Sequence, residues 1–359
     1  MRLAIDASRT TVARVTGTEH YALETIRALI KLNTEHEITL YFRDQPPPDL
    51  FPTSDKVTYQ VIPFAQLWTH LRFAAELWRE RPDLTWVPAH ALPAIFPGRA
   101  AVTIHDLGYK FFPQAHPARQ RLYLDWTTRM SAARASVVLA DSRATADDLT
   151  RFYGTPAQKI RVVYPGVDAP VMGDVEAARR KYGLPERYFF FLSTLQPRKN
   201  VARIVQAYAH WKAAHPGDAA ALVLAGGQGW LYDPAWTAGV DGVILPGYVD
   251  EGDKGSLYAG ALALVFPSLY EGFGFPVLEA MHCGTPVITS NTSSLPELTG
   301  DAALLVDPLD VGAIAEAMGA LSSEGALCES LRTKGYEQAR KFSWDAAAQA
   351  ALNLFEGII

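Results

Sequence analysis

The feature that most constrains the fold of this chain is a regular alternation of short apolar runs with stretches of helical character. The runs that we interpret as strands are RLAID, EITLYF, VTYQVI, LTWVPA, AAVTIHD, SVVLADS, KIRVVYPG, YFFFLST, AALVLA, GVILPG, ALALVF, PVITS and ALLV. Helical stretches are expected at residues 19–31, 64–79, 117–135 and 144–153. Such alternation is typical of parallel sheets that are covered by helices on both faces. We therefore expect an α/β fold made of doubly wound sheets.

The length of the chain and a polar stretch near its middle predict two domains. A chain of 359 residues holds two domains of ordinary size, each able to bury its own core. The polar stretch 169–176 follows the run VVYPGVD and marks the best seam. We expect a first domain at residues 1–170, a second at 171–342, and a terminal helix at 343–359.

Two glutamates, Glu271 and Glu279, flank a glycine-rich turn in the segment ALVFPSLYEGFGFPVLEAMHCGTP. A strand leads into this turn, and a helix is expected to begin at Pro276 and to stop at Gly284. N–H groups at a helix N-terminus attract phosphate, and here they belong to Gly272, Phe273, Gly274 and Phe275. An anion site between two carboxylates that accept hydroxyl groups suits a ligand with phosphates and vicinal diols, such as a nucleotide sugar.

Glu271 and Glu279, with seven residues between them, resemble the E-x7-E motif of retaining glycosyltransferase family 4. The resemblance is detailed in the second half of the chain and looser in the first. It implies two facing Rossmann-like domains (GT-B) with the site in the cleft between them. It also implies that the terminal stretch FSWDAAAQAALNLFEGII forms a helix that packs back on the first domain. In this family Glu271 would bind sugar hydroxyls and Glu279 the ribose hydroxyls.

The loop LSTLQPRKN follows a strand and precedes a helix that we expect Asn200 to cap. Arg198 and Lys199 place two cations beside that helix, which suits a diphosphate. The loop resembles the family's R-K-N segment, whose Arg and Lys hold the donor pyrophosphate. The following loop, AGGQGW, resembles the family's turn beneath the nucleotide base, and GYVD resembles a segment near the base.

In the first half, VTIHDLGY places His105 at the end of a strand, and the resemblance implies that it approaches the donor sugar and phosphate. Asp106 is the expected partner that orients its imidazole. His90 is a weaker candidate at another strand end, and Gly17 resembles the family's glycine loop. Ser142 lies in a segment that relatives place near the ligand, although a helix N-cap explains it equally well.

Together these motifs give the candidate site. The predicted catalytic residues are His105, Arg198, Lys199 and Glu271. The predicted donor-binding residues are Gly17, Gly226, Gly227, Tyr248, Gly272, Phe273, Gly274, Phe275 and Glu279.

Several motifs are absent from the sequence. There is no Asp-x-Asp triplet, no G-x-G-x-x-G after the first strand and no G-x-x-x-x-G-K-[ST]. We therefore expect neither a metal nor a cofactor, with the donor activated by Arg198, Lys199 and helix dipoles. A net charge of -5 makes nucleic acid an unexpected partner. Two cysteines and an N-terminus that enters a strand directly favour a cytoplasmic protein.

The charge is unevenly distributed. Residues 1–170 carry 20 Lys and Arg against 17 Asp and Glu, whereas the remainder carries 13 against 21. Four arginines (Arg119, Arg121, Arg129 and Arg134) share one helical stretch with Trp126, and residues 67–78 have the pattern of an amphipathic helix. This half could contact an anionic membrane surface at the inner face of the plasma membrane, although a solvated helix face gives the same pattern.

The resemblance implies a retaining, metal-independent transferase that makes a cell-surface glycan or glycolipid. The segments TLQPRKN, GGQGWLY and PSLYEGFGFPVLEAM are most similar to those of bacterial mannosyltransferases that use GDP-mannose. GDP-mannose is therefore the first choice of donor, and UDP-sugars are the second. The acceptor would be a glycan or a lipid-linked sugar. Two alternatives stay open, namely a GT-B sugar-nucleotide epimerase and a non-catalytic relative within a glycan assembly complex.

Overall fold

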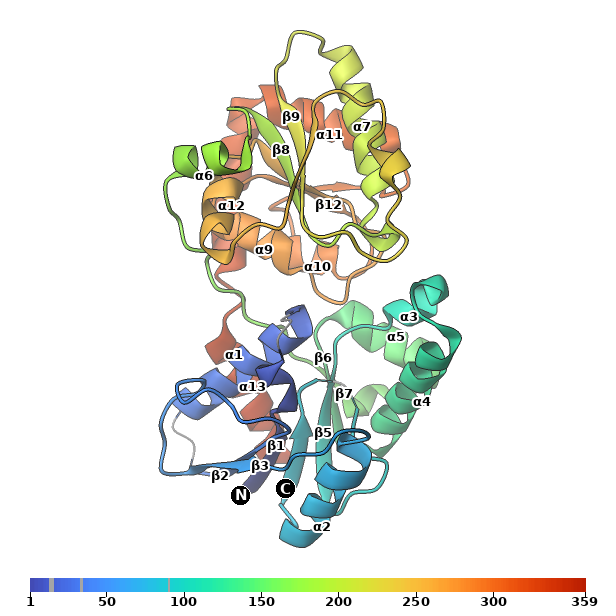
Figure 1. Cartoon of the computed structure of the whole chain (residues 1–359), viewed down its shortest axis with the longest axis vertical. Helices are drawn as coiled ribbons and strands as arrows, with labels where there is room; N and C mark the ends of the chain where they lie inside the picture. Colours follow the sequence, from blue (N-terminus) through green and yellow to red (C-terminus); the bar gives the residue numbers. More distant parts are fainter. Residues whose placement is uncertain (13–15, 33–34, 90) are drawn as a thin grey trace. The chain divides into compact units, whose positions relative to one another are not determined.

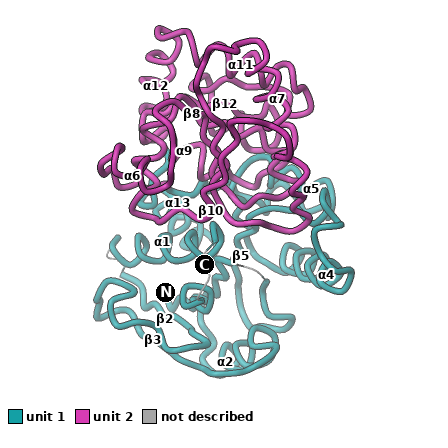
Figure 2. Tube along the Cα trace, turned by 45° about the horizontal axis from the view of Figure 1, so that its top comes forward, with its two compact units in different colours: residues 1–166, 342–359 teal, residues 167–341 magenta. Residues whose placement is uncertain are grey.

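The computed structural model describes residues 1–12, 16–32, 35–89 and 91–359, and the chain divides into two compact units. The first unit comprises Met1–Gly166 together with Phe342–Ile359, and the second comprises Val167–Lys341 (Figure 2). Each unit is built on one parallel sheet with helices packed around it (Figure 1). The α/β fold predicted from the alternating pattern is therefore confirmed.

The sheet of the first unit has the strand order β3-β2-β1-β4-β5-β6-β7. Its strands are β1 (Arg2–Asp6), β2 (Glu37–Phe42), β3 (Val57–Val61), β4 (Leu84–Val87), β5 (Arg99–Ile104), β6 (Val137–Ala140) and β7 (Ile160–Val162). Each of the pairings is parallel, with Ile5 opposite both Leu40 and Trp86. Every residue of β4 and β6 is buried, because helices cover both faces of a parallel sheet.

The helices of the first unit include one that comes from the far end of the chain. They are α1 (Gly17–Lys31), α2 (Ala74–Glu80), α3 (Gly108–Phe111), α4 (Ala118–Arg134), α5 (Arg143–Tyr153) and α13 (Trp344–Gly357). The α13 helix packs against α1, with the Trp344 ring 5.5 Å from that of His20 and Phe355 against Trp86. Gly166 lies so close to α13 that a Cβ there would be 2.1 Å from the Trp344 nitrogen. The terminal segment is thus part of the first unit's core.

The sheet of the second unit has the strand order β10-β9-β8-β11-β12-β13. Its strands are β8 (Tyr188–Leu192), β9 (Ala221–Ala225), β10 (Val243–Gly247), β11 (Ala263–Phe266), β12 (Val287–Ser290) and β13 (Leu304–Val306). Its helices are α6 (Val175–Tyr182), α7 (Val201–Ala214), α8 (Lys254–Ala259), α9 (Phe275–His282), α10 (Leu295–Thr299), α11 (Val311–Ser323) and α12 (Gly325–Ala339).

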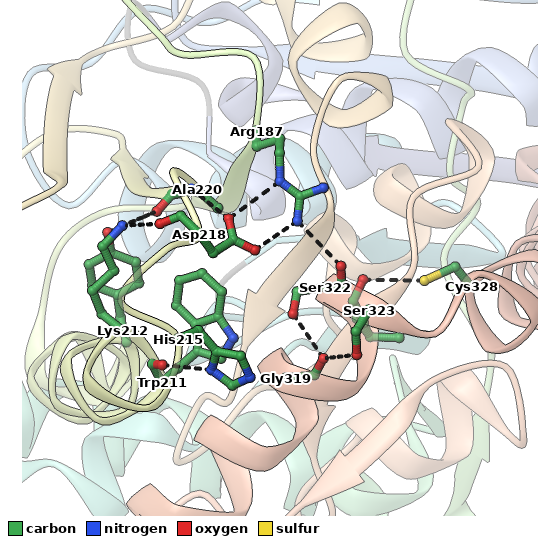
Figure 3. A network of polar contacts seen from close by, with 12 residues as sticks. Arg187, Trp211, Lys212, His215, Asp218, Ala220, Gly319, Ser322, Ser323 and Cys328 are labelled. Carbon is green, nitrogen blue, oxygen red and sulfur yellow. Dashed lines mark hydrogen bonds and ion pairs between the residues drawn. The ribbon is translucent and has the colours of Figure 1, made fainter.

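A polar network fastens the base of the second sheet to the helices beside it (Figure 3). Arg187, at the start of β8, pairs with Asp218 at 2.9 Å and donates to the carbonyl oxygen of Ser322 on α11. Just after α7, His215 stacks on Trp211 of that helix and donates from Nδ1 to its carbonyl oxygen at 2.8 Å. These contacts lie at the amino ends of the strands, so they support the fold and leave the opposite edge for ligands.

In both sheets the strand order reverses once, between β1 and β4 in the first unit and between β8 and β11 in the second. In open α/β sheets, ligands bind outside the carboxyl ends of the strands that flank such a reversal. The loops that follow β8 and β11, and those that follow β1 and β4, are therefore the expected binding loops of this fold.

One predicted helix begins later than the sequence pattern indicated. The helix expected at residues 64–79 starts with a π-helical turn at Thr69–Phe73, which continues into α2. Leu67 has a φ of 54°, in the left-handed region, and a right-handed helix cannot continue through such a residue. Across the described residues, no helix combines the length and the apolar character needed to cross a bilayer.

Candidate functional site

The loop after β8 is joined to the loops after β11 and β13 by Asn200. The loop ends in a 3-10 turn, Pro197–Lys199, and Asn200 follows with a φ of 63°. Its amide donates to the carbonyl oxygens of Pro267 at 2.9 Å and Pro308 at 2.6 Å. Asn200 is the N-cap residue of α7, as expected, but its side chain makes no capping hydrogen bond to a helix N–H. Its Oδ1 instead accepts from Arg203 Nη1 at 3.0 Å.

Three predicted residues meet at the reversal between β8 and β11. Lys199 Nζ lies 2.6 Å from Glu271 Oε1, and Arg198 Nη1 lies 3.5 Å from Glu271 Oε2. Lys199 and Glu271 are only 7% and 6% exposed. Burial would raise the pKa of Glu271, but the charges of Lys199 and Arg198 outweigh it and hold the pKa below its usual value. Glu271 is therefore ionised, and its charge is matched by two cations.

Two serines that sequence reasoning missed hold the backbone of Glu271. Ser293 Oγ accepts from the Glu271 N–H at 3.0 Å and donates to its carbonyl oxygen. Ser294 Oγ donates to the same carbonyl and to that of Phe273. Ser293 has a φ of 60°, which is uncommon for a residue with a side chain and is often tolerated at functional sites. Serines are common in loops, so the sequence carried no signal for this contact.

The α9 helix begins directly after the glycine-rich turn. Gly274 is its N-cap with a φ of 139°, which disfavours any side chain, and Pro276 is the second residue instead of the expected first. Phe273 packs against Phe275 with ring centroids 5.1 Å apart. The turn 272–275 therefore brings backbone N–H groups and the positive end of a helix dipole next to Glu271.

Glu279 lies one turn into α9 and is held by α8. The Tyr258 hydroxyl donates to its Oε2 at 2.8 Å, and Lys254 Nζ lies 3.9 Å from its Oε1. Burial, together with the charge of Glu279, raises the pKa of Tyr258 well above its ordinary value, so this hydroxyl remains a donor. The Glu279 side chain keeps 19% of its surface exposed, which leaves room for a ligand hydroxyl. Tyr258 and Lys254 were not predicted from the sequence.

The loops after β9 and β10 contain the remaining predicted residues of the second unit. Gly226 has a φ of 126°, and a Cβ there would lie 2.0 Å from the Ser193 carbonyl oxygen. No residue but glycine fits this position. At Gly227, by contrast, an added Cβ would meet no described atom within 4 Å, so a ligand could approach its backbone. Tyr248, just after β10, is 73% exposed.

In the first unit, His105 lies at the end of β5, as predicted, but its partner differs from the expected one. His105 Nδ1 lies 2.6 Å from Asp141 Oδ2, and Nε2 lies 2.9 Å from the Pro88 carbonyl oxygen. Asp106 instead accepts a hydrogen bond from the Gly108 N–H at 2.7 Å. Asp106 was the wrong choice because it follows His105 directly, and successive residues of an extended chain point to opposite sides.

The other first-unit candidates lie at helix N-termini. Gly17 is the first residue of α1, whose preceding residue Thr16 donates its N–H to Glu19 at 3.1 Å. Ser142 is buried and caps α5 by accepting from the Thr145 N–H, which confirms the N-cap interpretation. His90 lies outside the described residues.

The structure thus brings Arg198, Lys199 and Glu271 into direct contact, with Glu279 on the helix that follows. Gly226, Gly227 and Tyr248 follow the neighbouring strands of the same sheet. His105 and Gly17 belong to the first unit. Within the described ranges, no group of three or more His, Cys, Asp or Glu side chains is arranged to hold a metal ion.

Comparison with known proteins gives the family. Residues 15–170 match the model of Glycosyltransferase Family 4, and residues 174–338 match that of Glycosyl transferases group 1. O-antigen chain mannosyltransferase B of Escherichia coli is 32% identical over 72% of this chain and 70% of that protein. A D-inositol 3-phosphate glycosyltransferase of Acidothermus cellulolyticus is 32% identical over 62% of this chain and 53% of that protein. The match to the serotype-specific mannosyltransferase WbdA of Escherichia coli spans 29% of that longer protein.

Solved structures give the same fold. The chain resembles sucrose-phosphate synthase from Thermosynechococcus elongatus with a TM-score of 0.75 and 23% identity, over 99% of this chain and 98% of that one. It also resembles the Anabaena protein HepE in complex with UDP-glucose, with a TM-score of 0.75 and 16% identity, over 99% of each chain. The two parallel sheets, the two matching family models and these relatives lead to one conclusion. This chain belongs to the group 1, family 4 glycosyltransferases and has their GT-B fold.

Proposed function

We propose that this chain is a retaining, metal-independent glycosyltransferase that moves a hexose from a nucleoside-diphosphate sugar to a glycan or lipid-linked sugar. The observation that carries the proposal is the buried contact of Lys199 with Glu271 beside Arg198, at the strand reversal and next to the N-terminus of α9. Mannose from GDP-mannose is the favoured donor group, since relatives are named as mannosyltransferases. HepE in complex with UDP-glucose supports UDP-sugars as the second choice.

The roles of the residues follow from their charges. When the bond from the anomeric carbon to the phosphate oxygen breaks, its electron pair leaves with the nucleoside diphosphate. Arg198, Lys199 and the N–H groups at α9 stabilise that growing negative charge, as a metal ion does in other transferases. The acceptor oxygen bonds to the anomeric carbon on the same face, and its proton goes to the departing phosphate. No cofactor takes part.

Glu271 acts in this scheme as a positioning group for the sugar hydroxyls. Its carboxylate contacts Lys199 and Arg198, whose positive charges lower its pKa and stabilise its ionised form. A carboxylate held in this way is a weak nucleophile and a weak base. Glu279, which keeps exposed surface beside Tyr258, accepts the ribose hydroxyls.

Thermal unfolding with GDP, UDP or ADP, each with and without EDTA, tests this proposal. A ligand at about 100 times its dissociation constant adds about 2.7 kcal/mol, enough to raise the midpoint by several degrees. We expect GDP to shift the midpoint and EDTA to have no effect. A shift with UDP alone would mean that the donor is a UDP-sugar. The lack of a shift with every nucleotide would indicate a non-catalytic relative. In a separate turnover assay, conversion of the donor without any acceptor would indicate an epimerase.

Replacing Glu279 with alanine should weaken nucleotide binding more than it changes any other property of the protein. The loss of a charged hydrogen bond costs about 1.5–3 kcal/mol, or about 10- to 150-fold in affinity. Calorimetric titration with GDP measures this change. Glu329→Ala, which removes an exposed glutamate on α12, is the matched control. An unchanged affinity in Glu279→Ala would remove this residue from the donor site.

We also propose that the first unit docks on an anionic membrane surface. His70 brings three segments together: Nε2 lies 3.0 Å from the Tyr123 hydroxyl, the ring lies 5.7 Å from that of Trp126, and Nδ1 accepts from the Ala94 N–H. These segments carry a group of exposed apolar side chains, here called the His70 patch, made of Leu67, Leu71, Ile95, Leu122, Tyr123 and Trp126. The α4 helix adds four arginines against one aspartate, Asp125, which pairs with Lys110. Apolar side chains among arginines suit an anionic bilayer surface.

Replacing an apolar side chain of the His70 patch with a polar one should weaken the binding of the protein to vesicles. Each large side chain withdrawn from water contributes about 1.5–3 kcal/mol, so Leu122→Ser should weaken binding about 10-fold or more. Co-sedimentation with vesicles of equal parts phosphatidylglycerol and phosphatidylcholine measures binding, and pure phosphatidylcholine tests the role of charge. Val171→Ser, at an exposed apolar residue of the second unit, is the control. Equal binding by both variants would exclude the patch.

A further inference from the structure

The His105 ring joins the carboxyl ends of three adjacent strands. His105 follows β5, its partner Asp141 follows β6, and Pro88, whose carbonyl oxygen it contacts, follows β4. The Tyr21 ring packs edge-on against the imidazole with centroids 4.9 Å apart. Thr145 Oγ1 donates to the His105 carbonyl oxygen at 3.1 Å, which fixes the backbone as well. The ring is thus held in one orientation at the ligand-binding edge of the first sheet.

The two contacts of the ring determine how its protons are placed. A backbone carbonyl only accepts hydrogen bonds, so Nε2 must carry a hydrogen. An ionised Asp141 also only accepts, so Nδ1 then carries a second hydrogen and the ring is an imidazolium. Burial lowers the pKa of His105, but the charge and hydrogen bond of Asp141, together with the charge of Asp106, outweigh it and raise the pKa above its ordinary value. Burial also raises the pKa of Asp141, against the opposing charge of His105, so the two groups share the proton on Nδ1 as a coupled pair. Both ring nitrogens are engaged by the protein, so His105 is not arranged to exchange a proton with a ligand.

Asp141 is an unusual residue for its surroundings. It is 3% exposed, and within the described part of the chain its Oδ1 has no hydrogen-bond partner. A buried carboxylate with one unsatisfied oxygen costs stability, and an apolar residue would cost less. The contact with His105 is the hydrogen bond that its carboxylate makes. A group that is unfavourable for folding and is directed at a single side chain serves that side chain's function.

We infer that Asp141 is a positioning residue for glycosyl transfer, which holds His105 as a fixed, positively charged ring at the ligand-binding edge of the first unit. The inference rests on the proposed function and on the family resemblance, which implies that His105 approaches the donor sugar and phosphate. The ring supplies positive charge to a phosphate whose negative charge grows as the sugar departs. Such a fixed charge stabilises a transition state without reorganisation.

Asp141→Asn separates charge from shape and is the test. The asparagine amide can donate to an unprotonated Nδ1, so the ring keeps its place and becomes neutral, with its hydrogen on Nε2. Nitrogen-15 NMR of histidine side chains, with His105 assigned by the signal missing in His105→Gln, distinguishes an imidazolium from a neutral ring. We expect the imidazolium pattern in the parent protein and the neutral pattern in Asp141→Asn. Asp6→Asn, at a buried aspartate that ends β1, is the matched control and should leave the His105 signal unchanged.

Kinetics complete the test. In Asp141→Asn we expect kcat to fall about 10-fold or more, with little change in the KM of the donor, because the lost charge acts mainly in the transition state. An unchanged His105 signal would overturn the inference, and so would a changed signal with an unchanged kcat. If the parent protein transferred no sugar from any nucleotide donor, the proposed function would fail and the catalytic part of this inference with it. The NMR comparison would then still decide whether Asp141 sets the charge of His105.

Discussion

Replacing Arg198 with alanine is expected to lower kcat by about 10²- to 10³-fold, which is the usual cost of removing one preorganised group from a developing charge. The guanidinium is held in place by the Tyr270 carbonyl oxygen at 3.3 Å and by Glu271 at 3.5 Å. Because charge on the leaving phosphate grows toward the transition state, kcat should fall more than donor affinity does. Steady-state kinetics together with calorimetric titration of the nucleotide measure the two effects separately.

Two further variants make the Arg198 result interpretable. Arg198→Lys keeps the charge but loses the planar fork of donors, so an intermediate kcat is expected. Arg332→Ala removes an exposed arginine from α12 and should leave both constants unchanged. Equal losses of kcat and affinity in Arg198→Ala would mean that the side chain binds donor and transition state alike, contrary to the proposed role.

Replacing Lys199 with methionine is expected to lower the free energy of unfolding by about 3–5 kcal/mol, because it leaves Glu271 buried with its closest cation removed. Methionine keeps the length of the side chain and its contact with the Phe266 ring, over which Lys199 lies at 4.9 Å. The double variant Lys199→Met/Glu271→Gln removes both charges and should recover much of the lost stability. Urea denaturation measures all of these free energies, and activity should stay low in both variants.

The loss of stability caused by Lys199→Met should be larger at neutral pH than in acid. The pKa of Glu271 in the folded protein lies below its ordinary value of 4.5, so the ion pair stabilises the fold above that value. This stabilisation is lost as the pH falls through the lower, folded pKa. Without Lys199, buried Glu271 should take up a proton more readily, so the difference between parent and variant should shrink in acid. A difference that stayed constant between neutral and acidic pH would contradict the assignment of the effect to Glu271.

The strands and the binding loops were predictable because their signals are local. A parallel strand that is buried on both faces is an uninterrupted apolar run, such as YFFFL at β8, and can be recognised without knowing its neighbours. The residues that follow such runs lie at one edge of the sheet, and this position, together with the family resemblance, is why Arg198, Lys199, Glu271 and His105 could be selected in advance. Their roles in catalysis stay predictions that the variants above test.

The partners of those residues were not predictable. Asp141 lies 36 residues after His105, and Tyr258 lies 21 residues before Glu279. The adjacent Asp106 was the wrong choice for His105, and Asn200 occupies the predicted N-cap position but directs its amide to Pro267 and Pro308. Each depended on neighbours along the chain, whereas the actual partners are neighbours in the sheet or on the next helix.

The sequence by itself determined the alternating α/β architecture, the family and the loops that carry the chemistry, because apolar periodicity and short motifs are properties of neighbouring residues. Only the tertiary structure decided that Lys199 neutralises buried Glu271, that Ser293 holds its backbone and that Asp141 holds His105. The physical reason is that these contacts depend on strand order and register. β8 pairs with β11, and β5 pairs with β6 in a register that sets Ile104 opposite Ala140, the last residue of each strand. No local propensity encodes that alignment.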